Sequence, residues 1–153
     1  MQPMPESLSY LLVHIIFSTK KRAPLLEASV RPNLHAYLAT VVRGLDCERL
    51  RVGGVSDHVH LAVRLSRTIA VSKVVEKLKT SSSKWLKTQS QALHACAWQR
   101  GYAALSVGPS NTNALIQHLA TQEQHHMTCT YQDEYRAFLR RYGISSIERH
   151  LWD

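Results

Sequence analysis

The spacing of hydrophobic positions changes along the chain, and each spacing indicates a different kind of secondary structure. Residues 10–17 form an almost continuous apolar run, which is typical of a strand covered on both faces. Residues 57–63 alternate, so His58 and His60 are expected on one face of a strand and their apolar neighbours on the other. Apolar positions at helical spacing predict helices over residues 27–42, 71–87, 110–126 and 132–142.

A further strand is expected over residues 46–52 and one or two strands over residues 98–107, with Gly53 and Gly54 forming the turn before the His58 strand. The order is then strand, helix, strand, strand, helix, strand and helix. It predicts an α+β fold of the ferredoxin-like (split βαβ) type, an antiparallel sheet with helices packed mainly on one face. We find no repeat or linker, so residues 1–153 are expected to form a single domain whose C-terminal helix carries site residues.

The net charge of the chain says more about its possible partners than its hydrophobic content does. The 153 residues are 44% hydrophobic, which suits a folded globular protein. The formal charge is +8 and the isoelectric point is near 9.7, so a polyanionic partner is favoured. The alternative is a globular protein that is basic without a functional reason.

Cysteine usage and the apolar runs indicate the compartment. Cys47, Cys96 and Cys129 are scattered and odd in number, which argues against a disulfide framework or a thiolate zinc site. Residues 1–5 do not begin a signal peptide, and the longest apolar run is too short to span a bilayer. A cytoplasmic protein with no membrane partner is therefore expected, associated with the nucleoid when bound to DNA.

Two groups of side chains could carry chemistry. His58 and His60 place two imidazoles side by side on one strand, which is a good start to a metal site. His118, Gln122 and His125 are spaced i, i+4 and i+7, so they share one stripe of a helix. If that helix brings Gln122 to the histidine pair, a three-ligand site for a divalent ion results. The alternative is a polar helix face exposed to solvent.

A basic zone follows the histidine strand in the sequence. Its candidate DNA-binding residues are Arg64, Arg67, Lys73, Lys77, Lys84, Lys87 and Arg100. The hydroxyls of residues 81–83 could bond phosphate oxygens, and Trp98 and Tyr102 could stack on unpaired bases. Trp85 is instead expected in the core, and a lysine-rich helix is often only a solvated surface.

Several motifs in order along the chain resemble one family. They are His14-Ile15-Ile16-Phe17-Ser18-Thr19-Lys20, Asp57-His58-Val59-His60, Ser81-Ser82-Ser83-Lys84-Trp85, Trp98-Gln99-Arg100-Gly101-Tyr102, Ser106-Val107, Gln122-Glu123-Gln124-His125-His126 and Leu151-Trp152-Asp153. The chain resembles the IS200-like (IS200/IS605) single-tyrosine transposases of the HUH endonuclease superfamily, and the resemblance covers essentially its whole length.

The resemblance implies a specific reaction and a specific set of ligands. A divalent metal, Mg²⁺ or Mn²⁺, would be held by His58, His60 and Gln122. The implied activity is cleavage and rejoining of hairpin-flanked single-stranded DNA during transposition, through a covalent link to a helix tyrosine. The resemblance also implies a homodimer, in which the tyrosine helix of one subunit serves the metal site of the other.

The chain departs from the family pattern at the nucleophile. The residue one helical turn before Gln122 is His118, where the family has its tyrosine. The chain could be a non-catalytic copy that still binds single-stranded or hairpin DNA. The imidazole of His118 could instead act as nucleophile or general base. A third alternative is that Tyr131 or another tyrosine takes the role.

Overall fold

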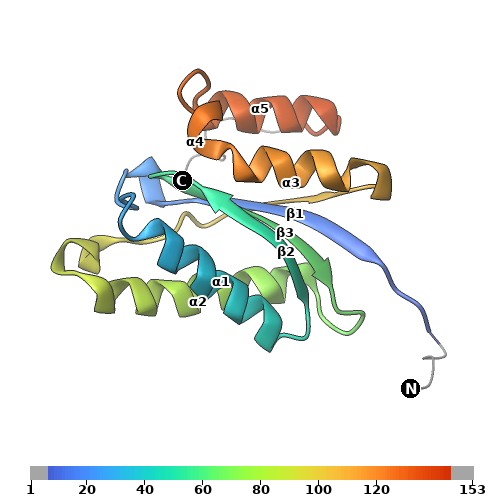
Figure 1. Ribbon diagram of the computed structural model, residues 1–153, viewed down its shortest axis with the longest axis horizontal. Coiled ribbons are helices and arrows are strands. Elements are labelled where there is room, and N and C mark those ends of the chain that lie inside the picture. The colour runs from blue at the N-terminus through green and yellow to red at the C-terminus, as the bar shows by residue number, and fades with distance from the viewer. Residues whose placement is uncertain (1–6, 146–153) are drawn as a thin grey trace.

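The computed structural model describes residues 7–145, and its centre is a four-stranded antiparallel sheet (Figure 1). The strands are β1 (Leu11–Ser18), β2 (Glu48–Gly54), β3 (His58–Leu65) and β4 (Ala103–Ser106). Their order across the sheet is β2-β3-β1-β4, so β1 and β3 are the two central strands. With one helix after β1 and another after β3, this topology confirms the predicted split βαβ fold of the α+β class.

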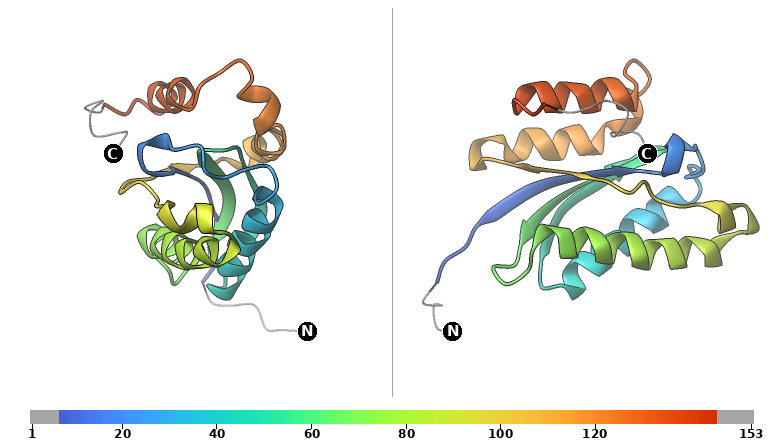
Figure 2. Two further views of the ribbon diagram at one scale, coloured as in Figure 1. Left: turned by 90° about the vertical axis from the view of Figure 1, so that its left-hand side faces the viewer. Right: turned by 180° about the vertical axis from the view of Figure 1, so that it is seen from behind.

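The helices cover both faces of the sheet, whereas the sequence pattern predicts them mainly on one face (Figures 1 and 2). On one face lie α1 (Arg31–Gly44) and α2 (Val71–Gln89), the two helices of the split βαβ unit. On the other face lie α3 (Thr112–Ala120), α4 (Gln122–His125) and α5 (Tyr131–Arg141). Short 3-10 helices lie at Lys20–Arg22, Gln91–Ala95 and Pro109–Asn111. None of the helices over residues 7–145 is both long and apolar enough to cross a membrane.

The main core lies between the sheet and helices α1 and α2. Alternate residues of β3 point into it, and Val59, Leu61 and Val63 are all completely buried there. Strand β1 contributes Ile15 and Phe17 from the same face of the sheet. Because successive side chains of a strand point to opposite faces, His58 and His60 point toward α3, α4 and α5.

The opposite face holds only a small apolar cluster. Ile16 of β1 and Leu105 of β4 pack there against Tyr131 and Tyr135 of α5, with Phe138 at its edge. This cluster attaches α5 to the sheet. This cluster is smaller than the main core, and polar side chains lie beside it beneath α4 and α5.

The predicted helix over 110–126 is interrupted. Thr121 separates α3 from α4 with non-helical torsion angles, φ −112° and ψ 25°. Its hydroxyl donates to the carbonyl of Gln117 at 2.9 Å, a bond to the preceding turn that bends helices. The break changes the direction in which the side chains of α4 point, and this matters for the site.

The predicted glycine turn before β3 is also placed differently. Gly53 and Gly54 are the last residues of β2, and residues 55–57 make the turn. A Cβ atom at Gly53 would lie 2.1 Å from the carbonyl oxygen of Leu119 in α3. A glycine is therefore needed here because the backbone of α3 lies directly against the sheet.

Candidate metal centre

The histidine pair of β3 lies at the centre of the polar side of the sheet. His58 and His60 are both completely buried. The Nδ1 atom of His58 lies 2.7 Å from Oδ1 of Asp57, and Nδ1 of His60 lies 2.7 Å from Nε2 of His14. These contacts hold each imidazole ring in place and leave its Nε2 atom directed into the site. His14 is a buried residue, as expected, and it positions a site histidine as well.

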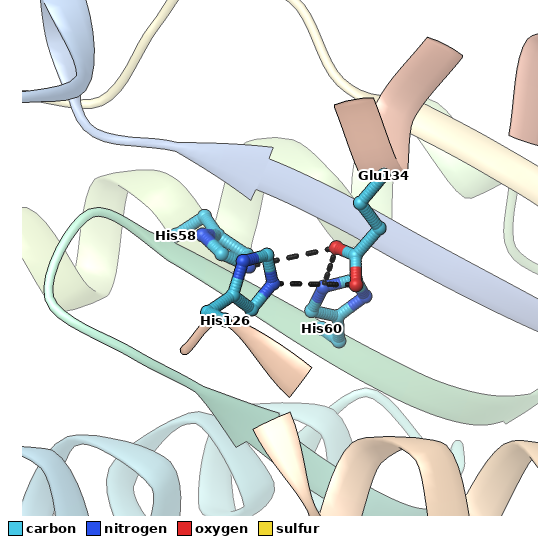
Figure 3. Close-up of side chains that lie close together, drawn as sticks. All are labelled: His58, His60, His126 and Glu134. Carbon is cyan, nitrogen blue, oxygen red and sulfur yellow. Dashed lines mark ion pairs between the residues drawn. The ribbon is translucent and has the colours of Figure 1, made fainter. Parts of the chain in front are cut away.

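A carboxylate from α5 faces the pair. Glu134 is 4% exposed, and its Oε1 atom lies 2.8 Å from Nε2 of His60 and 3.6 Å from Nε2 of His58 (Figure 3). Its second oxygen, Oε2, faces three histidines of α3, α4 and the residue after α4. The Nε2 atoms of His125, His118 and His126 lie 2.9, 3.1 and 3.2 Å from it.

Gln122 is brought to the histidine pair, as its position on the sequence predicts. It is 2% exposed, and its Oε1 atom lies 3.3 Å from Nε2 of His58 and 3.1 Å from Nε2 of His126. Its amide nitrogen donates to the backbone oxygen of His118 at 3.2 Å. The amide oxygen therefore faces the centre of the site, which is the orientation a metal ligand needs.

The charge states of the site follow from burial and from the neighbouring rings. Burial alone would raise the pKa of Glu134, but the imidazoles of His118, His126 and His60 that face the carboxylate outweigh it and hold that pKa far below its usual range. Burial lowers the pKa of His60 to about 4, although Glu134 opposes the shift. At neutral pH the site therefore contains an ionised carboxylate and a neutral imidazole, the forms that bind metals.

The tautomers of two histidines show that a cation fits here. Nδ1 of His126 lies 2.7 Å from the carbonyl of Cys129, so it must carry the hydrogen and leave Nε2 with a lone pair. That lone pair faces the carboxylate of Glu134. The same holds for His58, whose Nδ1 donates to Asp57. Two acceptors facing each other require a shared cation or proton, and a proton explains why the pKa of His126 is raised despite its burial.

The described residues contain two groups whose ligand atoms lie within 4.8 Å of one another. One group is His58, His60, His126 and Glu134, and the other is His118, His125 and Glu134. Nitrogen and carboxylate ligands of this kind suit Mn²⁺, Zn²⁺ and related divalent ions. The residues of this structure therefore fit the metal that the resemblance implies.

His118, the residue at the tyrosine position, borders the same centre. Its ring centroid lies 5.9 Å from that of His60, and 29% of its side chain is exposed. It also lines a cavity of about 260 Å³, together with His14, Phe138 and Arg141 among other residues. His118 is thus the histidine through which the metal centre meets this cavity.

Tyr131 lies closer to the centre than its place in the sequence indicates. Its ring centroid is 4.5 Å from that of His58. The side chain is 3% exposed, and its hydroxyl donates to Oε1 of Gln99 at 3.3 Å. Burial, the leading cause, raises the pKa of Tyr131 well above its ordinary value. A nucleophile must lose its proton, so this environment opposes such a role for Tyr131.

The basic residues are not gathered around the histidines. Lys73, Lys77, Lys84 and Lys87 belong to α2, which lies across the sheet from the site (Figure 1). Arg64 lies over the ring of Tyr10, 4.5 Å from its centroid. Arg67 and Arg100 are exposed in the segments before α2 and before β4.

The candidate stacking residues mostly serve the core. Trp85 stacks on Tyr37 with 5.2 Å between ring centroids, as expected of a core residue. Trp98 packs edge-on against Phe17, and its indole nitrogen donates to the hydroxyl of Ser82 at 2.9 Å. These contacts leave the half-buried Trp98 and the buried Ser82 poorly placed to bind DNA.

Glu134 is the residue that the sequence pattern did not identify. It lies on the stripe of α5 that also contains Tyr131, Tyr135 and Phe138, all packed toward the sheet. An acidic residue on the apolar stripe of an amphipathic helix is the signal that could have identified it, because a buried carboxylate needs partners.

The comparisons with known proteins concern both sequence and fold. The family model described as "Transposase IS200 like" matches residues 7–122. No curated protein matches the chain. A crystal structure assigned as a transposase of Deinococcus radiodurans R1 is 22% identical, with a TM-score of 0.62, over 80% of this chain and 97% of that chain.

A second solved structure is described as a REP-associated tyrosine transposase bound to a REP hairpin. It is 12% identical, with a TM-score of 0.60, over 82% of this chain and 74% of that chain. At such low identities the two structures bear on the fold alone. The family model, in contrast, spans β1 to Gln122, which is most of the chain and includes both histidines of β3. This protein therefore belongs to the family of IS200-like transposases.

Proposed function

We propose that this transposase is a single-strand DNA endonuclease that requires a divalent metal and acts on hairpin-flanked DNA. The observation that carries the proposal is the convergence of the Nε2 atoms of His58 and His60 on the buried carboxylate of Glu134. A buried, ionised carboxylate facing imidazole lone pairs is an arrangement that a cation completes.

The metal would be held by His58, His60 and Gln122, with Glu134 as an additional ligand. When bound, it would act as a Lewis acid on an oxygen of the scissile phosphate. This nitrogen-containing ligand set suits Mn²⁺ better than Mg²⁺, which prefers oxygen ligands, although the family resemblance favours Mg²⁺. Asp57 and His14 would hold the two imidazoles in the orientation that binding requires.

His118 would take the place of the family tyrosine as a general base. Its Nε2 atom lies 3.1 Å from Glu134, and the partly exposed ring faces the adjacent cavity. An imidazole there could accept a proton from an attacking water molecule, and the strand would then be hydrolysed without a covalent protein–DNA link. This role explains why an ionisable group remains at a position without tyrosine.

The DNA would contact both faces of the protein. The solved neighbour named above is bound to a REP hairpin, and by analogy we propose that a hairpin is the substrate of this protein too. The single strand would enter the cavity beside His118 and Arg141, while Lys77 and Lys84 of α2 would bind phosphates of the hairpin stem. We propose a homodimer as the working unit.

The presence of His118 at the tyrosine position also supports a second candidate function. Because His118 stands where the reaction needs a tyrosine, the protein could bind metal and hairpin DNA without cleaving it. Such a module would act as a DNA-binding protein or regulator. Both candidates predict that binding weakens steeply as salt rises.

One experiment separates the two functions. The protein is incubated with a hairpin labelled at its 5′ or 3′ end and with Mn²⁺ or Mg²⁺, and products are resolved on a denaturing gel. We expect metal-dependent cleavage without a covalent adduct, abolished in His58→Ala and strongly reduced in His118→Ala. The variant His118→Tyr is expected to form the adduct. Binding without cleavage under either metal would reject the endonuclease and support the binding module.

A further inference from the structure

We propose that the site binds two divalent ions, with Glu134 as a bridging carboxylate and with His118 and His125 as ligands of the second ion. The proposal rests on the proposed metal dependence of the same centre and changes one role in it. With its Nε2 atom bound to the second ion, His118 would hold the ion that activates the water and would not itself accept the proton. The second ion would occupy a site that lacks any ligand from the strand, so it is distinct from the site of the histidine pair.

The two oxygens of Glu134 face different groups of histidines. Oε1 faces His60 and His58, at 2.8 and 3.6 Å from their Nε2 atoms. Oε2 faces His125 and His118, at 2.9 and 3.1 Å, and also His126 at 3.2 Å, so His126 lies between the two groups. A carboxylate that presents one oxygen to each of two ligand groups has the geometry of a bridge between neighbouring metal ions.

The contact distances alone would also fit a cluster held together by hydrogen bonds. The orientations of three of the atoms, however, do not allow hydrogen bonds. The Oε1 atom of Glu134 and the Nε2 atoms of His60 and His125 are buried and have no hydrogen bond of acceptable geometry with other described residues. His60 belongs to the first histidine group and His125 to the second, and the third atom is an oxygen of the carboxylate between them. Coordination to cations would satisfy all three, since a metal needs no hydrogen along the line of contact.

The two groups differ in how far they are exposed. The first can draw on His58, His60, His126 and Glu134, with Gln122 beside them, all buried or nearly so. The second has three ligands, and the side chains of His118 and His125 are 29% and 32% exposed. Three ligands with an open position are typical of sites that also bind a substrate.

The surroundings of the second group suit a phosphate ligand. His118 lines the cavity of about 260 Å³, and Arg141 lies on the wall of the same cavity. An ion held by His118 and His125 would therefore meet an anion that enters from the cavity side. Two imidazoles and one carboxylate favour Zn²⁺ or Mn²⁺ over Mg²⁺. His125 and Glu134 both lie beyond residue 122, where the family match ends.

The number of bound ions tests this proposal directly. The chelator-treated protein is loaded with Mn²⁺ or Zn²⁺, and bound metal is counted by native mass spectrometry. We expect two ions per chain in the wild type and one in His118→Ala and in His125→Ala. With Mn²⁺, electron paramagnetic resonance should show a spin-coupled pair, which Glu134→Gln abolishes. His94→Ala, on an exposed histidine outside the site, is the matched control and should retain two ions.

The result is independent of DNA cleavage. A wild type that binds a single ion overturns the second site, even if that protein cleaves the hairpin. Two bound ions without cleavage would instead overturn the endonuclease and leave the second site intact. Circular dichroism of each variant shows whether a lost ion reflects lost folding, and His125→Asn provides a smaller change if the alanine variant unfolds.

Discussion

The two faces of the sheet are built from different kinds of side chain, although they share the same strands. Beneath α1 and α2, the residues Val59, Leu61 and Val63 form a dry apolar core. Beneath α4 and α5, the alternate residues His58 and His60 meet Glu134. One face contributes stability by apolar burial, and the other keeps polar groups buried with incomplete partners. The second face is therefore where we expect stability to depend on protons and on any bound cation.

The largest expected effect concerns the apolar face. Leu61→Ala removes a completely buried side chain from the main core and should lower the free energy of unfolding by about 2–5 kcal/mol. Leu105→Ala, in the small cluster under α5, should lie at the low end of that range because fewer apolar neighbours surround it. Urea denaturation in the presence of a chelator measures both. Equal losses would contradict the difference between the two faces.

A smaller effect is expected where α3 meets the sheet. Gly53→Ala puts a methyl group against the carbonyl of Leu119, and we expect a loss of about 1–3 kcal/mol as α3 moves away. Because α3 carries His118, this variant should also lose the second bound ion. Gly44→Ala is the control, since no atom lies within 4 Å of its added Cβ. Unchanged unfolding and metal content in Gly53→Ala would show that α3 is not held this closely.

The polar face should make stability depend on pH. The pKa of His60 is about 4 in the folded protein, whereas the unfolded chain takes up this proton near pH 6.5. Between these values the unfolded state binds more protons, so the metal-free protein loses stability as pH falls, by at most about 1.4 kcal/mol per pH unit. In His60→Gln the slope of unfolding free energy against pH should be smaller.

The wild type must be compared with His60→Gln because His126 changes the stability with pH in the direction opposite to His60. The pKa of His126 is raised, since Glu134 outweighs its burial, so its contribution is present at low pH and is lost as pH rises. The difference between the wild type and His60→Gln isolates the contribution of His60. If the difference in unfolding free energy between the two proteins does not change between pH 6.5 and pH 4, the pKa of His60 is not lowered as stated.

The smallest effects are expected for DNA contacts. Arg141→Ala on the site face and Lys77→Ala on the α2 face should each weaken hairpin binding by a few-fold. The slope of log affinity against log salt should fall by about 0.7 in Arg141→Ala, which loses a contact to the single strand, and by about 0.9 in Lys77→Ala, which loses a contact to the duplex stem. Only Arg141→Ala should also slow cleavage, because Arg141 borders the cavity beside His118. Slower cleavage in Lys77→Ala would place the reactive strand on the wrong face.

The fold was predictable from the sequence because each element has a strong local signal. The apolar run of β1, the alternation in β3 and the amphipathic α2 all form at or near the expected positions. The break at Thr121 was not predictable, because the preference of one threonine for its i−4 carbonyl is weak against the helical spacing of the residues on both sides. Gly53 was expected in a turn because its close approach to α3 is a tertiary contact, and the local sequence does not indicate such contacts.

The site was predictable only in part. The shared strand face of His58 and His60, and the approach of Gln122 to them, follow from periodicity plus one helix docking. Glu134 lies in another helix, 74 positions after His60, so no local spacing connects them. Likewise, no local spacing indicates on which side of the sheet the α2 lysines lie. They are near His58 in the sequence but not in space, because the chain crosses to the other side of the sheet between β3 and α2 (Figure 2).

The alternation in β3 also has a consequence for how the chain folds. In the native register, Phe17 lies opposite Val59 and Ile16 opposite His60. A slip of one residue would rotate His58 and His60 into the apolar core and expose Val59 and Leu61 on the other face. Each imidazole buried there without a partner would cost about 1–3 kcal/mol. The ligand pair therefore discriminates against mispaired strands during folding, before any metal or DNA is bound.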